Sequence, residues 1–92
     1  MLMIEWTGQF KRDYKREIKG KYRLTIKNDL SLVIEMLANE QALEIRYHDH
    51  ALTGDWKDCR DCHIKPDLVL IYRKYYDILQ LIRLGFHSEL GL

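Results

Sequence analysis

Apolar residues recur at helical spacing in the first half of the chain. Leu2 to Trp6 is a short apolar run that predicts a strand, and the hydroxyl of Thr7 can cap a following helix. That helix is predicted over residues 8–19 and ends at Gly20. Its apolar positions recur every four residues, at Phe10, Tyr14 and Ile18. A second helix, predicted over residues 22–39, has an apolar face made of Ile26, Leu30, Val33 and Leu37.

After residue 40 the pattern changes to an alternation of apolar and polar positions, and β-branched and aromatic residues accumulate. Strands are predicted near 44–48, 57–64, 68–75 and 77–86, with a tight turn at Lys65-Pro66-Asp67. This order predicts an α+β fold in which two N-terminal helices pack on a small antiparallel sheet, essentially in the order β-α-α-β-β-β. Residues 1–92 are expected to form a single domain.

Length and composition narrow the class of protein. The chain has 92 residues, of which 47% are hydrophobic and 32% are charged, the balance of a soluble globular domain. The longest apolar run, residues 68–72, is too short to cross a bilayer, and the N-terminus lacks the pattern of a signal peptide. We therefore expect a cytoplasmic protein with no membrane partner.

The net charge of the whole chain is only +1, but one segment is strongly basic. Between Lys11 and Lys27, eight basic residues stand against two acidic ones, which gives a local charge of +6. Such a segment is either a solvated helix face or a surface that binds a polyanion, and charge alone does not decide between them. The candidates for polyanion contacts on the first helix are Lys11, Arg12, Lys15, Arg16 and Lys19.

All four histidines lie in the second half of the chain, near predicted loops or strand ends. His50 follows the strand near 44–48, His63 lies near the end of its strand, and Asp67 lies in the next turn. Alternation places Leu81, Arg83 and His87 on one face of the last strand. RNA cleavage by an internal 2′-hydroxyl needs a proton acceptor, a proton donor and a cation, without a metal or nucleotide cofactor. These residue types could supply all three if the strand order brings them together.

Other residues of this region suggest different chemistry. Cys59-Arg60-Asp61-Cys62-His63 matches the C-x-x-C-H pattern of haem attachment, and C-x-x-C also occurs in zinc and thiol-redox sites. In a strand, residues three apart point to opposite faces, so we interpret the two cysteines as separate thiols. Trp56 is interpreted as an anchor for its loop. The acidic residues, interpreted as turn formers and solvated strand residues, are Asp49, Asp55, Asp58 and Asp61.

Three spaced elements of the second half resemble the YafQ-type toxins of the RelE/ParE superfamily. Residues 49–56 have the pattern D-H-x-L-x-G-x-W, residues 60–67 have R-D-x-H-x-x-P-D, and residues 83–87 have R-x-G-x-H. The likeness spans nearly the whole chain, but before residue 40 it rests on the order of elements alone.

This resemblance implies an mRNA interferase, an endoribonuclease toxin that cuts mRNA on the ribosome and is neutralised by a cognate antitoxin. It implies no cofactor, and its partners would be the antitoxin and ribosome-bound mRNA, with the basic segment on ribosomal RNA. A basic active face is expected to be covered by an acidic, partly disordered antitoxin segment. An antitoxin that left the histidines accessible would instead inhibit by its bulk, by blocking entry to the ribosome, and sequence does not decide between the two. The resemblance implies catalytic positions at His50, His63, Asp67 and His87, with His87 as general acid and Arg83 stabilising charge on the phosphate.

The chain departs from the family pattern at several positions. Ala51 stands where a proline is common, and His48 stands where a lysine is usual. The chain closes with Gly91 and Leu92, where the family carries an aromatic residue that can stack on a base. Stacking on RNA therefore falls to Phe86 or is weaker.

Two other functions fit the same fold. A ParE-like toxin would poison DNA gyrase without hydrolysis and would not need this set of histidines. An inactive relative would only bind its partner and regulate transcription. Codon-positioned cuts in the messages of arrested cells would favour the nuclease, whereas DNA damage with intact messages would favour the gyrase inhibitor.

Overall fold

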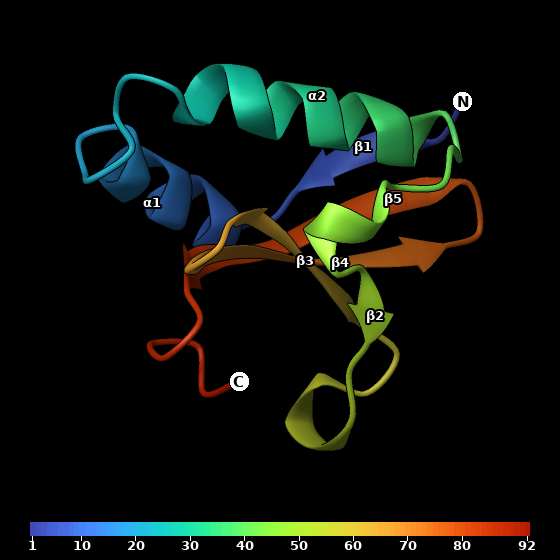
Figure 1. The fold of residues 1–92 in the computed structure, drawn as a ribbon. Coiled ribbons are helices and arrows are strands. Elements are labelled where there is room, and N and C mark those ends of the chain that lie inside the picture. Colours follow the sequence, from blue (N-terminus) through green and yellow to red (C-terminus); the bar gives the residue numbers. More distant parts are fainter.

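In the computed structural model, which describes residues 1–92, two helices lie on one side of a five-stranded sheet (Figure 1). The predicted α+β fold with two N-terminal helices on a sheet is confirmed. Neither helix is long and apolar enough to span a bilayer. In chain order the elements are β1 (Met3–Trp6), α1 (Gly8–Glu17), α2 (Ile26–Ala38), the short 3-10 helix η1 (Ile45–Tyr47), β2 (His50–Ala51), the short 3-10 helix η2 (Gly54–Trp56), β3 (Arg60–Lys65), β4 (Leu68–Tyr75) and β5 (Ile78–Phe86).

The sheet is mostly antiparallel, with the strand order β1-β5-β4-β3-β2. Only β1 is parallel to its neighbour, and it pairs with β5 as far as Leu81. There Thr7 continues the contact, because its hydroxyl donates to the Leu81 carbonyl at 2.7 Å. The same hydroxyl oxygen accepts from the Phe10 N–H at 3.2 Å and so caps α1, as predicted. The end of β1 therefore sets the position of α1 along β5.

The main core lies between the helices and the sheet. The apolar face predicted for the second helix is buried in it, and α1 contributes the fully buried Phe10. Burying one large apolar side chain stabilises a fold by about 1.5–3 kcal/mol, so this cluster is the main attachment of the helices. The sheet contributes Cys62, Ile64, Leu68, Leu70, Tyr72, Leu79, Leu81 and Leu84.

Several predicted boundaries differ from the structure, including the end of α1 at Glu17 rather than at residue 19 and the start of β3 at Arg60 rather than at residue 57. The strand predicted near 44–48 is instead η1, which ends at His48 with left-handed backbone angles (φ 50°, ψ 40°), and only His50–Ala51 forms a strand. The second helix begins at Ile26 rather than at residue 22. Residues 22–25 do not join the helix. The hydroxyl of Tyr22 instead donates to Asp67, in the β3–β4 turn, at 2.5 Å.

A bulge in β5 makes the predicted facing of that strand wrong. Ile71 pairs with Arg83 and Tyr72 with Leu81, which leaves Ile82 as an extra residue. As a result, both Leu81 and Leu84 point into the main core, although strict alternation places them on opposite faces. Arg83 therefore lies opposite the helices, on the face of Ile71, and not with Leu81 as predicted.

An antiparallel sheet with helices on one side is expected to leave its other face open, but this face is partly covered. Val69, Ile71 and Leu90 form a second buried cluster there. Trp56 packs against this cluster, which agrees with its predicted role as an anchor of the loop. Figure 1 shows the η2 loop and the C-terminal segment on this side of the sheet, below β3 and β4. Together they leave the ends of β3 and β5 as the free part of the face.

Candidate active site

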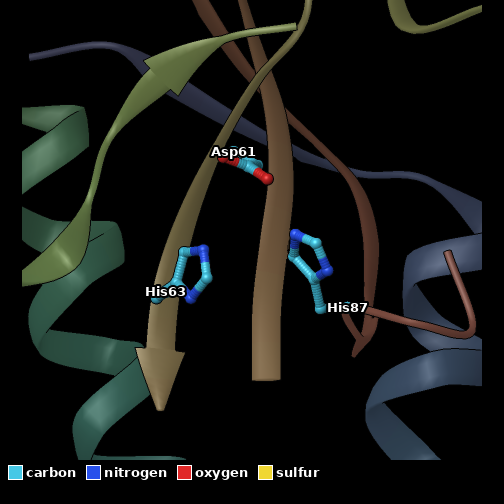
Figure 2. Close-up of side chains that lie close together, drawn as sticks. All are labelled: Asp61, His63 and His87. Carbon is cyan, nitrogen blue, oxygen red and sulfur yellow. The ribbon is translucent and has the colours of Figure 1, made fainter. Parts of the chain in front are cut away.

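Three imidazoles lie together at the ends of β3 and β5. The ring centroids of His63 and His87 are 5.7 Å apart, and those of His48 and His63 are 5.5 Å apart. The strands bring them together because His63 pairs with Val69 on β4, and Val69 pairs with Gly85, two residues before His87. In Figure 2 the rings of His63 and His87 face each other across the strand between them.

Asp61 lies on β3, two residues before His63 and on the same face of the sheet. Its carboxylate is 0% exposed, and both oxygens lack a well-formed hydrogen bond. One of its oxygens and the nearest ring nitrogens of His63 and His87 all lie within 4.8 Å of one another (Figure 2). Nδ1 of His50 is 3.0 Å from Oδ1 of Asp61. Burial raises the pKa of Asp61, and the neighbouring charges of the histidines oppose that shift.

Asp61 is the site residue that the sequence analysis missed. It was interpreted as a solvated strand residue, and this is wrong because the second apolar cluster and the histidines enclose it. The available signal was its spacing from His63, since residues two apart in a strand share a face. Sequence alone did not show that this face would be buried at Asp61 and open at His63.

Backbone carbonyls fix two of the rings in one tautomer. Nδ1 of His50 lies 2.6 Å from the carbonyl oxygen of His48, and Nδ1 of His63 lies 3.0 Å from that of Pro66. A carbonyl oxygen only accepts, so each Nδ1 carries the hydrogen and each neutral ring keeps its lone pair on Nε2. His50 and His63 are thereby arranged as proton acceptors, while the ring of His87 is not held in this way.

Asp67 faces the loop between the helices. It accepts hydrogen bonds from the Tyr22 hydroxyl at 2.5 Å and from Nζ of Lys21 at 3.0 Å. The hydrogen bond from Tyr22 is the main cause that lowers the pKa of Asp67, which keeps this carboxylate ionised at neutral pH. Its backbone carbonyl accepts from the N–H of His87 at 3.0 Å, so the turn also positions His87.

Arg83 is oriented by Asp13 of α1. Asp13 is fully buried at the edge of β5 that β1 leaves unpaired. Nε of Arg83 lies 2.7 Å from Oδ2 of Asp13, and the same oxygen accepts from the Leu84 N–H at 3.0 Å. Burial alone would raise the pKa of Asp13, but these hydrogen bonds and the charges of Arg83 and Arg16 lower it. The Arg83 side chain remains 28% exposed.

The basic residues of α1 have two different surroundings. Lys11, Arg12, Lys15 and Lys19 are exposed, as a surface for a polyanion requires. Arg16 instead bonds Glu17 at 2.7 Å, and its Nη2 donates to the Leu84 carbonyl at 3.0 Å. Arg16 therefore has a structural contact that the other four lack.

Two grooves meet at His63 and Pro66. The first, of about 550 Å³, lies between η1 and the end of β3 and includes Arg46, Tyr47, His48, His50 and Lys65. The second, of about 470 Å³, lies toward the C-terminal segment and includes Asp67, Phe86, His87, Ser88 and Glu89. Phe86 lines the second groove while also packing against the main core, so only part of its ring is available to a ligand.

The two cysteines lie on opposite faces, as predicted. Cys62 is buried in the main core, whereas Cys59 packs against the second cluster, and both are free thiols.

The residues that could hold a transition metal are Asp61, His63 and His87, whose donor atoms lie within 4.8 Å of one another. Carboxylate and imidazole groups suit Zn²⁺ or Cu²⁺, and the unpartnered oxygens of Asp61 fit such an ion.

Comparisons with known proteins agree on one family. Residues 2–91 match the family model described as the bacterial toxin of type II toxin–antitoxin system, YafQ. The mRNA interferase toxin YafQ of Escherichia coli K12 is 38% identical over 88 residues, which is 95% of this chain and 92% of that protein. A metal-bound toxin from Helicobacter pylori is 44% identical with a TM-score of 0.87, covering 98% of this chain and 99% of that one. YafQ in the E. coli DinJ-YafQ complex is 36% identical with a TM-score of 0.85, covering 98% of both chains.

Proposed function

This chain belongs to the YafQ family of type II toxins, and we propose that it is an mRNA interferase that cleaves ribosome-bound mRNA by acid–base catalysis. The observation that carries the proposal is the group of histidines around Asp61, in which two rings are set as proton acceptors and a third is free. A gyrase inhibitor or an inactive relative would not need this arrangement.

The proposed reaction uses the 2′-hydroxyl of the RNA as nucleophile. Nε2 of His50 or His63 takes the hydroxyl proton, and the 2′-oxygen forms a bond to phosphorus. Protonated His87 gives its proton to the departing 5′-oxygen as the P–O5′ bond breaks. The products are a 2′,3′-cyclic phosphate and a 5′-hydroxyl, so no water or cofactor enters this step.

Three charged residues are proposed to support this chemistry. The donor role falls to His87, because its ring lies beside the Asp61 carboxylate and is not held by a backbone carbonyl as the rings of His50 and His63 are. Arg83 lines neither groove, but it shares a face of the sheet with Asp61 across β4. Arg83, oriented by Asp13, would stabilise the charge that develops on the phosphate through its remaining N–H groups. Asp67, held ionised by Tyr22 and Lys21, would act on the orientation of His87 rather than as a proton donor.

The exposed basic residues of α1, together with Lys19, are proposed to bind ribosomal RNA. Lys11, Arg12, Lys15 and Lys19 line neither groove, so they can hold phosphates while the site engages the message. Arg16 would contribute less because it is bound to Glu17 and to the Leu84 carbonyl. Phe86 would contact a base with the part of its ring that lines the second groove.

A cognate antitoxin is the proposed protein partner. The related YafQ chain is found in a complex with DinJ, which supports this pairing. An acidic antitoxin segment that orders on binding would complement the basic surface of the toxin and cover the histidines.

Expression of the chain without an antitoxin tests the proposed function. We expect growth arrest, with primer extension revealing cuts at fixed positions within codons of translated messages. Cells that arrest with intact messages and a DNA-damage response would instead support gyrase inhibition and would refute the nuclease.

Asp61→Asn is expected to stabilise the fold and to impair cleavage. The raised pKa means that the folded state binds the Asp61 proton more tightly than the unfolded state, so the ionised carboxylate destabilises the fold at neutral pH. The amide removes that cost, so the free energy of unfolding at pH 7 should rise. Cleavage should fall by roughly tenfold, because the protonated ring loses its counter-charge.

Urea unfolding and cleavage by the same preparation measure both effects. Asp58→Asn is a suitable control, since Asp58 is exposed and lies outside the cluster. A less stable Asp61→Asn protein that cleaves at the wild-type rate would contradict the role given to Asp61.

Added Zn²⁺ or Cu²⁺ is expected to inhibit cleavage. Asp61, His63 and His87 would hold the ion, and coordination would occupy the ring nitrogens that proton transfer requires. Titration calorimetry should detect one site in the wild-type chain and much weaker binding in Asp61→Ala. If saturating metal increased the rate, the proton-transfer role of these rings would be wrong.

A further inference from the structure

The first groove contains a flat, cationic surface that the proposed chemistry does not use. In η1, Cζ of Arg46 lies 4.6 Å from the ring centroid of Tyr47, and Nη2 donates to the Tyr47 hydroxyl at 2.9 Å. The Tyr47 ring is half-buried and packs against the main core, which gives the pair a fixed base. The Arg46 side chain is 68% exposed, so the guanidinium is accessible from solvent.

This Arg46–Tyr47 pair is close to the proton acceptors. It lines the same groove as His48, His50 and His63. η1 is joined to this group through His48, whose left-handed backbone turns its carbonyl toward Nδ1 of His50 at 2.6 Å. The segment that orients the proposed base therefore also carries the Arg46–Tyr47 pair.

The positions of acceptors and donor assign a direction to the RNA. The nucleotide on the 5′ side of the cut carries the attacking 2′-hydroxyl, so its ribose must lie beside His50 and His63, in the first groove. The nucleotide on the 3′ side carries the departing 5′-oxygen, so it must lie beside His87, in the second groove. His63 belongs to both grooves and marks the place of the scissile phosphate.

A nucleobase is the ligand that suits the surface at Arg46. Unpaired bases stack on aromatic rings and on arginine planes, and the guanidinium also interacts favourably with π faces. Lys65 also lines this groove, but its ammonium pairs with Asp29 of α2, which leaves Arg46 as the more exposed cation of the groove. Glu44 lies 3.3 Å from Nε of Arg46 and restrains the guanidinium from one side.

We propose that Arg46, supported by Tyr47, binds the base of the nucleotide immediately 5′ of the cleaved phosphate. This site rests on the proposed nuclease function and adds a specificity contact to it. Base preference at the position 5′ of the cut is then set by η1, and base preference at the 3′ position by the second groove.

Cleavage of ribosome-bound messages that differ only in the base 5′ of the cut tests this site. Arg46→Ala is expected to raise KM by about tenfold, to leave kcat within about twofold, and to reduce the differences among the four bases. Arg46→Lys keeps the charge but loses the planar group, and it should behave like Arg46→Ala. Preference at the base 3′ of the cut should remain as in the wild-type chain.

Arg73→Ala is the matched control. Arg73 lies 4.5 Å from the ring centroid of Tyr75 in an equivalent pair, but it lines neither groove. Arg46→Ala with unchanged KM and base preference, or Arg46→Lys with wild-type behaviour, would overturn the stacking site while the nuclease function stands. A wild-type chain that cleaves no message would overturn the nuclease function and this site with it.

Discussion

His87→Ala is expected to lower the rate of mRNA cleavage by about 10²–10⁴-fold, the usual range for the loss of a general acid or base. The ring of His87 faces His63 at 5.7 Å between centroids and is not anchored to a backbone carbonyl. No other group replaces it, because Asp67 is held ionised and the rings of His50 and His63 are oriented as acceptors. Growth arrest on expression should be lost with the rate.

The fold should survive this substitution, since the side chain of His87 is not part of either apolar cluster. Purified His87→Ala should match the wild-type chain in circular dichroism and in its urea midpoint. His48→Asn is the matched control, because it removes an imidazole of the same cluster that has no assigned proton transfer and asparagine tolerates the left-handed backbone there. Its effect should remain below tenfold. A folded His87→Ala protein as toxic as the wild-type chain would refute the assignment.

Asp13→Ala is expected to destabilise the domain by about 3 kcal/mol. The carboxylate of Asp13 accepts from Arg83 and from the Leu84 N–H at the edge of β5, where β1 no longer provides a strand partner. The substitution leaves that N–H unbonded and removes the partner of Arg83. It does not leave a fully buried cation, because Arg83 and Arg16 are both partly exposed.

The stability that Asp13 contributes should depend on pH. Its folded pKa lies below its ordinary value of 3.8, so the contribution is present at neutral pH and is lost as the pH falls through the folded pKa. Urea unfolding of the wild-type and Asp13→Ala chains should therefore differ most near pH 7 and converge as the pH approaches 2. Equal stability of the two chains at pH 7 would show that the Asp13 contacts are not needed at this edge.

The features that could be predicted from sequence are those set by periodicity over many residues. The spacing of Ile26, Leu30, Val33 and Leu37 predicted the buried face of α2, and the alternating runs predicted β4 and β5 to within one or two residues. The histidines could be named as candidates because their chemistry depends on residue type. Their convergence required the strand order, which places β3, β4 and β5 side by side.

The features that sequence did not predict depend on single local contacts. The bulge at Ile82 reverses the facing of half of β5, and no residue type at that position signals it. Asp61 and Asp13 resemble ordinary solvated carboxylates until tertiary packing buries them. η1 lies where a strand was predicted near 44–48. It ends at His48, whose left-handed backbone is a conformation that non-glycine residues rarely take.

The chemistry of the cut ends tests the central claim, that imidazoles gathered around one phosphate cleave RNA through its own 2′-hydroxyl. The measurement is mass spectrometry of the fragments released from ribosomes programmed with a defined message and treated with the purified chain. A 2′,3′-cyclic phosphate on the upstream fragment and a 5′-hydroxyl on the downstream fragment are predicted, and a single 2′-deoxy substitution at the cut should abolish cleavage. A 3′-hydroxyl paired with a 5′-phosphate, or cleavage that persists at the 2′-deoxy position, would contradict the mechanism.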